Sequence, residues 1–139
     1  MIIRIEHIGI AVKNLGISNE LFSKIMGRDY YKMEVVDSEN VSTSFFKTGE
    51  SKIELLESSS SESAIAKFIE KKGEGIHHIA FEVDDLKAEM IRLKKEGFRL
   101  INEDPKLGAD QKLVCFIHPQ DTNGVLIELC QSIIENEKK

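Results

Sequence analysis

The chain has 139 residues, a length that fits one domain of ordinary size. Hydrophobic residues make up 41% of it, enough to build a core, and charged residues make up 31%. The formal net charge of -5 excludes the basic surface expected of a nucleic-acid-binding protein. No stretch approaches the roughly 18 consecutive apolar residues that a membrane span requires. We therefore expect neither nucleic acid nor a membrane as a partner.

The N-terminal segment MIIRIEHIGIAV predicts a strand rather than a signal peptide, because Arg4, Glu6 and His7 interrupt its apolar run. Cys115 and Cys130 lie inside apolar, strand-like runs. We expect both to be small buried thiols in a reducing compartment, with a disulfide or a reactive thiol as the alternatives. These features together predict a soluble cytoplasmic protein.

Hydrophobic periodicity predicts two similar series of elements joined by a connecting helix. The first series is a strand over 2–12, a helix over 18–27, and strands near 30–36, 41–48 and 51–57. The connecting helix covers 62–72, where SAIAKFIEKKG has apolar residues at helical spacing and stops at Gly73. The second series is a strand over 76–83, a helix over 85–97, and strands near 98–103, 112–118 and 123–130.

The two series are an internal repeat. EHIGIAVKNL (6–15) matches HHIAFEVDDL (77–86), so that His7 corresponds to His78. The shared Ile-Glu-Leu of the last strands places Glu54 opposite Glu128, and the offset is 71 residues at the histidines and 74 at the glutamates. The predicted fold is α+β: two βαβββ modules forming one open, curled mixed sheet around a metal site, with helices outside. We expect a single domain over 1–139, with module one about 1–57, the connecting helix about 62–72 and module two about 76–130.

Four residues of the repeat predict a metal site. His7 and His78 each share a strand face with small residues, whereas the opposite faces carry larger apolar residues that suit packing under a helix. Glu54 and Glu128 lie in strands that are apolar on both sides, where a buried carboxylate is costly unless it is paired or bound to a cation. We expect no Lys or Arg within these runs to act as that partner, so a cation is the simplest explanation. Two imidazoles and two carboxylates suit Co, Ni, Zn, Mn or Fe(II).

The sequence resembles the vicinal-oxygen-chelate superfamily (glyoxalase/bleomycin-resistance/dioxygenase) and, within it, the methylmalonyl-CoA epimerase family. The likeness covers nearly the whole chain. It is carried by IEHIGIAVKNL, KIELLES, the connecting helix running into GEGIHHIAFEVDD, the EDPKLGA loop, and FIHPQDTNGVLIEL. Segments such as HIGIAV are found throughout the superfamily, whereas the last three together point to the epimerase family.

The resemblance implies a metal-dependent isomerase that inverts C2 of methylmalonyl-CoA through an enolate, as a small homodimer in propionate metabolism. It assigns the metal to His7, Glu54, His78 and Glu128, with Co²⁺ favoured over Ni²⁺, Mn²⁺, Zn²⁺ or Fe²⁺. A metal that chelates the thioester oxygen would stabilise the enolate, and a carboxylate base must remove the C2 proton. Glu128 is the first candidate for that base, and Glu54 is a second catalytic candidate.

The chain departs from this family at two places. Some epimerases have a second catalytic glutamate in the strand that corresponds to 41–46, where this chain has Thr43. Glu54, a water molecule or Glu39 in a rearranged loop are possible substitutes. The second departure follows His118-Pro119, where Gln120 stands in place of a Lys found in many relatives. We expect His118 and Lys106 to bind the substrate, although His118 could instead pack at a strand end.

Two other functions remain open. Lactoylglutathione lyase (glyoxalase I) is a metal enzyme of the same superfamily, but its sequences usually have an Arg soon after the first metal ligand. Here the first Arg after His7 is Arg28. A non-catalytic small-molecule-binding resistance protein is the other alternative, and such proteins often lack the four metal ligands.

Overall fold

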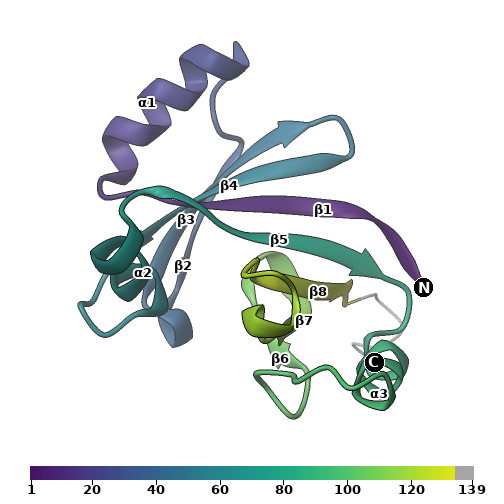
Figure 1. Cartoon of the computed structure of the whole chain (residues 1–139). Coiled ribbons are helices and arrows are strands. Elements are labelled where there is room, and N and C mark those ends of the chain that lie inside the picture. Colours follow the sequence, from purple (N-terminus) through teal and green to yellow (C-terminus); the bar gives the residue numbers. More distant parts are fainter. Residues whose placement is uncertain (134–139) are drawn as a thin grey trace. The chain divides into compact units, whose positions relative to one another are not determined.

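The structure is a computed structural model, and it describes residues 1–133 (Figure 1). Its helices are α1 Leu15–Met26, α2 Ala64–Lys72 and α3 Leu86–Lys95. Its strands are β1 Ile2–Ala11, β2 Lys32–Val36, β3 Val41–Thr48, β4 Ser51–Ser58, β5 Gly75–Val83, β6 Lys106–Leu107, β7 Lys112–Ile117 and β8 Ile127–Ser132. The strands are hydrogen-bonded in the order β2-β3-β4-β1-β5-β8-β7-β6, with parallel and antiparallel pairs, which confirms the predicted α+β class and mixed sheet. No helix among the described residues is long and apolar enough to cross a membrane.

The chain divides into two compact units, and each is described by itself. The central unit is His7–His77, and the terminal unit is Met1–Glu6 together with His78–Lys139. The boundaries fall inside β1 and β5, immediately beside the two predicted histidine ligands. The modules predicted from the sequence instead meet between strands, the first ending at about residue 57 and the second beginning at about residue 76. The single-domain organisation stays a prediction.

Side-chain caps determine where the helices begin. The Asn14 side chain accepts a hydrogen bond from the Ile17 backbone N–H, so α1 begins at Leu15 rather than at the predicted residue 18. Ser63 caps α2 in the same way. Gly27 ends α1 with a φ of 74°, a left-handed conformation that glycine adopts without steric cost. The ends of α1 and α2 were therefore readable from the sequence, whereas the start of α1 was predicted too late and α3 ends at Lys95 rather than at the predicted residue 97.

The predicted strand near 98–103 is wrong. Within it only Leu100 forms a bridge, an isolated contact with β7. Two backbone hydrogen bonds flank this bridge, from the Ile101 N–H to the Phe116 carbonyl and from the His118 N–H to the Arg99 carbonyl, both at 2.8 Å. Beyond Ile101 the Asn102 side chain takes over from the backbone: its Oδ1 accepts from the Phe116 N–H (3.0 Å) and its Nδ2 donates to the Val114 carbonyl (3.2 Å). The two-residue β6 pairs with β7 instead. Periodicity cannot reveal a side chain that substitutes for main-chain hydrogen bonds.

Replacing Asn102 should destabilise the fold. Asn102→Ala leaves partly buried Val114 and Phe116 backbone groups without this partner, so we expect a loss of about 1–3 kcal/mol in the free energy of unfolding. Asn102→Asp keeps the acceptor for Phe116 but sets a carboxylate oxygen against the Val114 and Asp104 carbonyl oxygens, so it should lose at least as much. Urea unfolding followed by circular dichroism measures both. Equal stability of Asn102→Ala and the parent chain would contradict this role.

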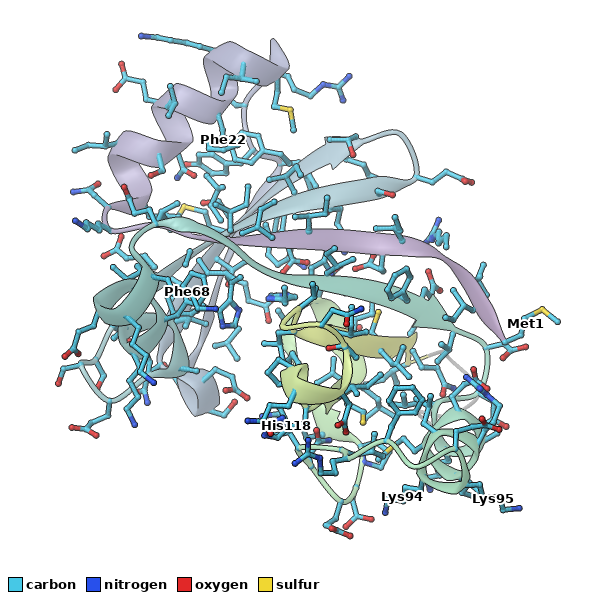
Figure 2. The ribbon with its side chains drawn as sticks, viewed as in Figure 1. Met1, Phe22, Phe68, Lys94, Lys95 and His118 are labelled. Carbon is cyan, nitrogen blue, oxygen red and sulfur yellow. The ribbon has the colours of Figure 1, made fainter. Side chains whose placement is uncertain are left out.

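Helices pack on both faces of β4 in the central unit (Figure 1). Leu55 belongs to a buried cluster with residues of α1, and Leu56 to a cluster with residues of α2. Figure 2 labels one aromatic from each helix, Phe22 on α1 and Phe68 on α2; the Phe22 ring lies 6.3 Å from that of Phe46. α2 covers one end of the ligand-bearing face, where Ala11 and Leu56 lie, a position that the sequence did not indicate.

In the terminal unit, α3 packs on one face of β7 and β8. The buried cluster there contains Val83, Leu86, Met90, Leu93, Cys115, Ile117 and Leu129. Cys130 lies in a second cluster with Ala80 and Val114. Both cysteines are buried and free, as predicted. Burial raises the pKa of the Cys115 thiol to about 11 and also raises the pKa of Cys130, so neither is a ready nucleophile.

Candidate functional site

The central unit holds one predicted histidine–glutamate pair. β1 and β4 run parallel, and their register places Glu54 beside Gly9, two residues after His7. The small Gly9 leaves room for the imidazole and the carboxylate to meet, and His7 Nδ1 lies 3.1 Å from Glu54 Oε2. Both side chains are buried. This pair comes entirely from the first half of the repeat.

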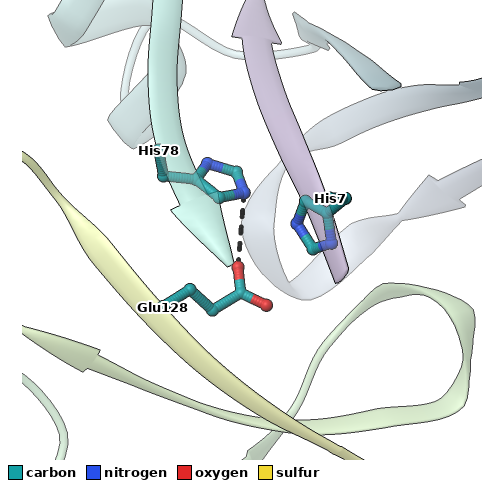
Figure 3. A group of neighbouring side chains, drawn as sticks. All are labelled: His7, His78 and Glu128. Atoms are coloured by element: carbon teal, nitrogen blue, oxygen red, sulfur yellow. Dashed lines mark ion pairs between the residues drawn. The ribbon is translucent and has the colours of Figure 1, made fainter. Parts of the chain in front are cut away.

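The terminal unit holds the second pair in the same arrangement. β5 and β8 run parallel with Ala80 opposite Glu128, so the glutamate again lies beside the small residue that follows the histidine by two. His78 Nε2 lies 3.3 Å from Glu128 Oε1, the ion pair drawn in Figure 3. The Phe116 ring meets the His78 imidazole edge-on at 6.2 Å between centroids. The equal registers confirm that the sequence repeat is a structural repeat.

Each pair has the spacing expected of two ligands on one ion. With metal–ligand bonds of about 2.1 Å, neighbouring ligand atoms lie about 3.0 Å apart in octahedral and about 3.4 Å apart in tetrahedral coordination. The observed separations are 3.1 Å and 3.3 Å. Buried imidazole and carboxylate donors are also the ligand types that transition metals take. The residues therefore fit a divalent ion.

A buried lysine beside Glu54 was missed. Lys52 is 7% exposed and lies opposite His7 in the parallel register. It precedes Glu54 by two residues, so both side chains lie on one face of β4. This corrects the expectation that no cation lies within the strand runs around the glutamates, and period-2 alternation would have revealed it. The matching position of the second repeat is Leu126, so the two halves differ in charge.

The terminal unit contains a further buried acid. Glu6 is 2% exposed and lies 4.0 Å from the Lys112 ammonium group, which also donates to the Ser132 hydroxyl at 2.8 Å. Its partner could not be inferred, because Lys112 is more than a hundred residues away in the sequence.

Thr43, which stands where some relatives have a second glutamate, and Glu39, a possible substitute, lie outside the strands that carry the two pairs. Thr43 is fully buried in the middle of β3. Its Oγ1 has no hydrogen-bond partner within residues 1–133. Glu39 lies in a short 3₁₀ turn, Asp37–Glu39, between β2 and β3.

The predicted substrate-binding residues lie in the terminal unit. Lys106 is exposed on β6, with its Nζ 5.7 Å from the centroid of Phe116, the ring that contacts His78. His118 follows β7 and caps a 3₁₀ turn, Pro119–Asp121, where its Nδ1 accepts from the Gln120 N–H at 3.2 Å. Their roles in binding remain predictions.

His77, next to His78, is packed against an aromatic side chain. Its ring lies 5.0 Å from Phe68 in an edge-on contact within the central unit. Burial lowers the pKa of His77 to about 4, so the imidazole is neutral at physiological pH. Strand alternation places the two histidines on opposite faces, and His78 is the one that lies against Glu128.

An ion pair holds the turn that His118 begins. Asp121 Oδ1 accepts from Arg99 Nη2, and its Oδ2 accepts from the Arg99 backbone N–H, both at 2.8 Å. The hydrogen bonds from Arg99 lower the pKa of Asp121 from 3.8 to about 2. Because the folded pKa is depressed, this stabilisation is present above about pH 4 and is lost as the pH falls towards 2.

We expect Asp121→Asn to remove that component of the acid sensitivity. The free energy of unfolding from urea titrations, measured between pH 5 and pH 2 for both proteins, tests it. The stability difference between parent and variant should shrink as the pH falls, because the parent carboxylate becomes protonated. A difference that stays constant through this range would contradict the assignment.

Comparisons with known proteins give a consistent result. The family model of the Glyoxalase/Bleomycin resistance protein/Dioxygenase superfamily matches residues 6–116. Ethylmalonyl-CoA/methylmalonyl-CoA epimerase of Cereibacter sphaeroides is 39% identical, over 94% of this chain and 99% of its own length. The crystal structure of methylmalonyl-CoA epimerase from Mycobacterium tuberculosis has a TM-score of 0.93 at 31% identity, covering 99% of this chain and 93% of that one. A variant of Streptomyces coelicolor methylmalonyl-CoA epimerase in complex with 2-nitronate-propionyl-CoA has a TM-score of 0.90 at 33% identity, over 96% of this chain and all of that one.

Proposed function

Since the chain belongs to the Glyoxalase/Bleomycin resistance protein/Dioxygenase superfamily and matches methylmalonyl-CoA epimerases over nearly its whole length, we propose that it interconverts the (2R) and (2S) epimers of methylmalonyl-CoA. The observation that carries the proposal is the repeated, buried histidine–glutamate pair, with the same register in both halves. Each pair buries a carboxylate at a cost in desolvation, so a purely structural role would not explain why the fold has two of them.

His7, Glu54, His78 and Glu128 are proposed to hold one divalent ion jointly, with Co²⁺ first among Co²⁺, Ni²⁺, Mn²⁺, Zn²⁺ and Fe²⁺. When bound, the ion supplies positive charge at the thioester oxygen, where negative charge develops as the C2 proton leaves. The four side chains contribute two negative charges, which offset the charge of the ion itself. Glu54 is carboxylate rather than amide, so it strengthens binding of a divalent cation.

Glu128 is proposed to move the C2 proton. The C2–H of a thioester is a very weak acid, and its removal requires a base within hydrogen-bond reach of carbon 2. Glu128 combines burial, a histidine neighbour at 3.3 Å and a position beside the small Ala80. Glu54 occupies the equivalent place in the central unit and is the other catalytic candidate from the metal set.

Substrate contacts are proposed at Lys106 and His118, both in the terminal unit. Lys106 is exposed and cationic, which suits the anionic groups of an acyl-CoA. His118 would orient the acyl end. A cytoplasmic homodimer acting in propionate metabolism completes the proposal.

Proton exchange distinguishes this function from its rivals. The purified protein is incubated with (2S)-methylmalonyl-CoA in D2O with Co²⁺, and the C2 proton is followed by NMR. The proposal expects metal-dependent loss of the C2 signal together with formation of the (2R) epimer, and no reaction after chelation. Turnover of the methylglyoxal–glutathione hemithioacetal without exchange would instead establish lactoylglutathione lyase activity. Inertness towards both substrates would favour a binding protein.

A further inference from the structure

Lys52 is a buried charge of the central unit that has no part in the proposed function. It lies opposite His7 in the parallel pairing of β1 and β4, and it precedes Glu54 by two residues. Residues opposite one another in paired strands point to the same face of the sheet, and so do residues two apart in one strand. Lys52 therefore shares a face with both proposed metal ligands of the central unit.

The ammonium group of Lys52 lies beside the cross-strand neighbour of Glu54. In the antiparallel pairing of β3 and β4, Lys47 is opposite Lys52, whereas Phe45 is opposite Glu54. The Lys52 Nζ nevertheless lies 5.6 Å from the centroid of the Phe45 ring. The side chain thus brings its charge into the part of the sheet face that Glu54 occupies.

A neighbouring strand shows what the spacing of Lys52 and Glu54 allows. β2 has the same Lys-X-Glu order in Lys32 and Glu34, and there the Nζ lies 3.5 Å from the carboxylate Oε1. The Lys32 Nζ also lies 4.8 Å from the centroid of the Phe45 ring, as that of Lys52 does from the other side. A lysine two residues before a glutamate on this face can therefore contact both the carboxylate and the ring.

Burial makes the charge of Lys52 effective. Lys52 is 7% exposed, and both His7 and Glu54 are buried beside it. A buried ammonium group is costly unless opposite charge or an aromatic face lies near it, and Glu54 and Phe45 supply the two. Because little water lies between these groups, their charges act on one another more strongly than exposed charges do.

The second half of the repeat has no such lysine. The residue two positions before Glu128 is Leu126. With neutral imidazoles, each histidine–glutamate pair carries one negative charge, and Lys52 cancels it in the central unit alone. The difference in charge between the halves therefore concerns Glu54 and not Glu128.

Resting on the proposed function, we propose that Lys52 is a positioning residue that offsets the charge of Glu54 and so preserves the positive charge of a divalent ion held there. A carboxylate ligand reduces that charge more than a neutral ligand does, and the charge is what stabilises the developing enolate. The Lys52 ammonium group compensates for the carboxylate without being a ligand itself. The consequence is weaker binding of the ion, because like charges repel one another.

Calorimetric titration of the metal-free protein with Co²⁺ tests the sign of this effect without depending on catalysis. Lys52→Met keeps an unbranched side chain and removes the charge, so it should bind Co²⁺ about tenfold more tightly than the parent chain. Lys52→Arg keeps the charge and should bind as the parent does. Saturated with Co²⁺, Lys52→Met should exchange the C2 proton of (2S)-methylmalonyl-CoA in D2O more slowly than the parent.

Lys47→Met is the matched control. Lys47 lies opposite Lys52 in β3 but is exposed, so water and salt screen its charge and its removal should leave the Co²⁺ affinity unchanged. If Lys52→Met does not fold, Lys52→Gln, which also removes the charge, gives the same test.

The outcomes separate this inference from the function on which it rests. Tighter Co²⁺ binding together with slower exchange supports the role of Lys52. Weaker binding in the charge-removing variant would show that Lys52 serves to hold Glu54 in place, and unchanged binding or unchanged exchange would show that its charge does not act on the ion. Each of these results overturns the inference and leaves the epimerase function standing. A parent chain that binds no Co²⁺ or exchanges no C2 proton overturns the function and the inference together.

Discussion

Glu128→Gln should abolish epimerisation while the protein stays folded. Gln has the shape of Glu and can still contact His78, but it cannot accept a proton from carbon 2, so we expect kcat to fall by about 10²–10⁴-fold. Formation of the (2R) epimer from (2S)-methylmalonyl-CoA, followed by chiral chromatography, measures the loss. The metal content and far-ultraviolet circular dichroism of the variant show whether the site and the fold persist.

Glu50→Gln is the matched control for this experiment. Glu50 is exposed in the turn between β3 and β4 and lies outside the proposed site, so the same loss of charge there should leave kcat unchanged. A fully active Glu128→Gln would show that Glu128 is not the base. Loss of the metal alone, with activity restored by saturating Co²⁺, would show that it serves only as a ligand.

The chain should bind one divalent ion, and both halves of the repeat should be needed to hold it. Mass spectrometry of the dialysed protein should give one metal per chain. Removing either imidazole, in His7→Ala or His78→Ala, should weaken Co²⁺ binding by at least about 100-fold, because a ligand contributes at least as much as a residue that supports one. Isothermal titration of the metal-free protein measures the affinity without depending on catalysis.

The remaining two histidines of the chain provide the controls. His77 contacts Phe68 and His118 caps a turn, so His77→Ala and His118→Ala should keep the metal stoichiometry and affinity of the parent chain. Two ions per chain would show that the pairs at His7 and His78 act as separate sites. An unchanged affinity in either ligand variant would remove that half from the proposed metal centre.

The internal repeat made much of the site readable in advance. His7 and His78 were matched by sequence alone, and the parallel strands then place each histidine's own glutamate at the same register. Lys52 could also have been found, since it precedes Glu54 by the two residues of strand alternation.

What the sequence by itself determined is local: the type of most elements, the helix ends, the repeat and the residues that face the same way along each strand. These follow from backbone geometry and from the polarity of near neighbours. Only the tertiary structure decided which strands are adjacent and in what register. It shortened one predicted strand to a single bridge followed by the side-chain contacts of Asn102, and it joined Glu6 to Lys112. Those pairings depend on hydrogen bonds between distant segments, which no local pattern of polarity encodes.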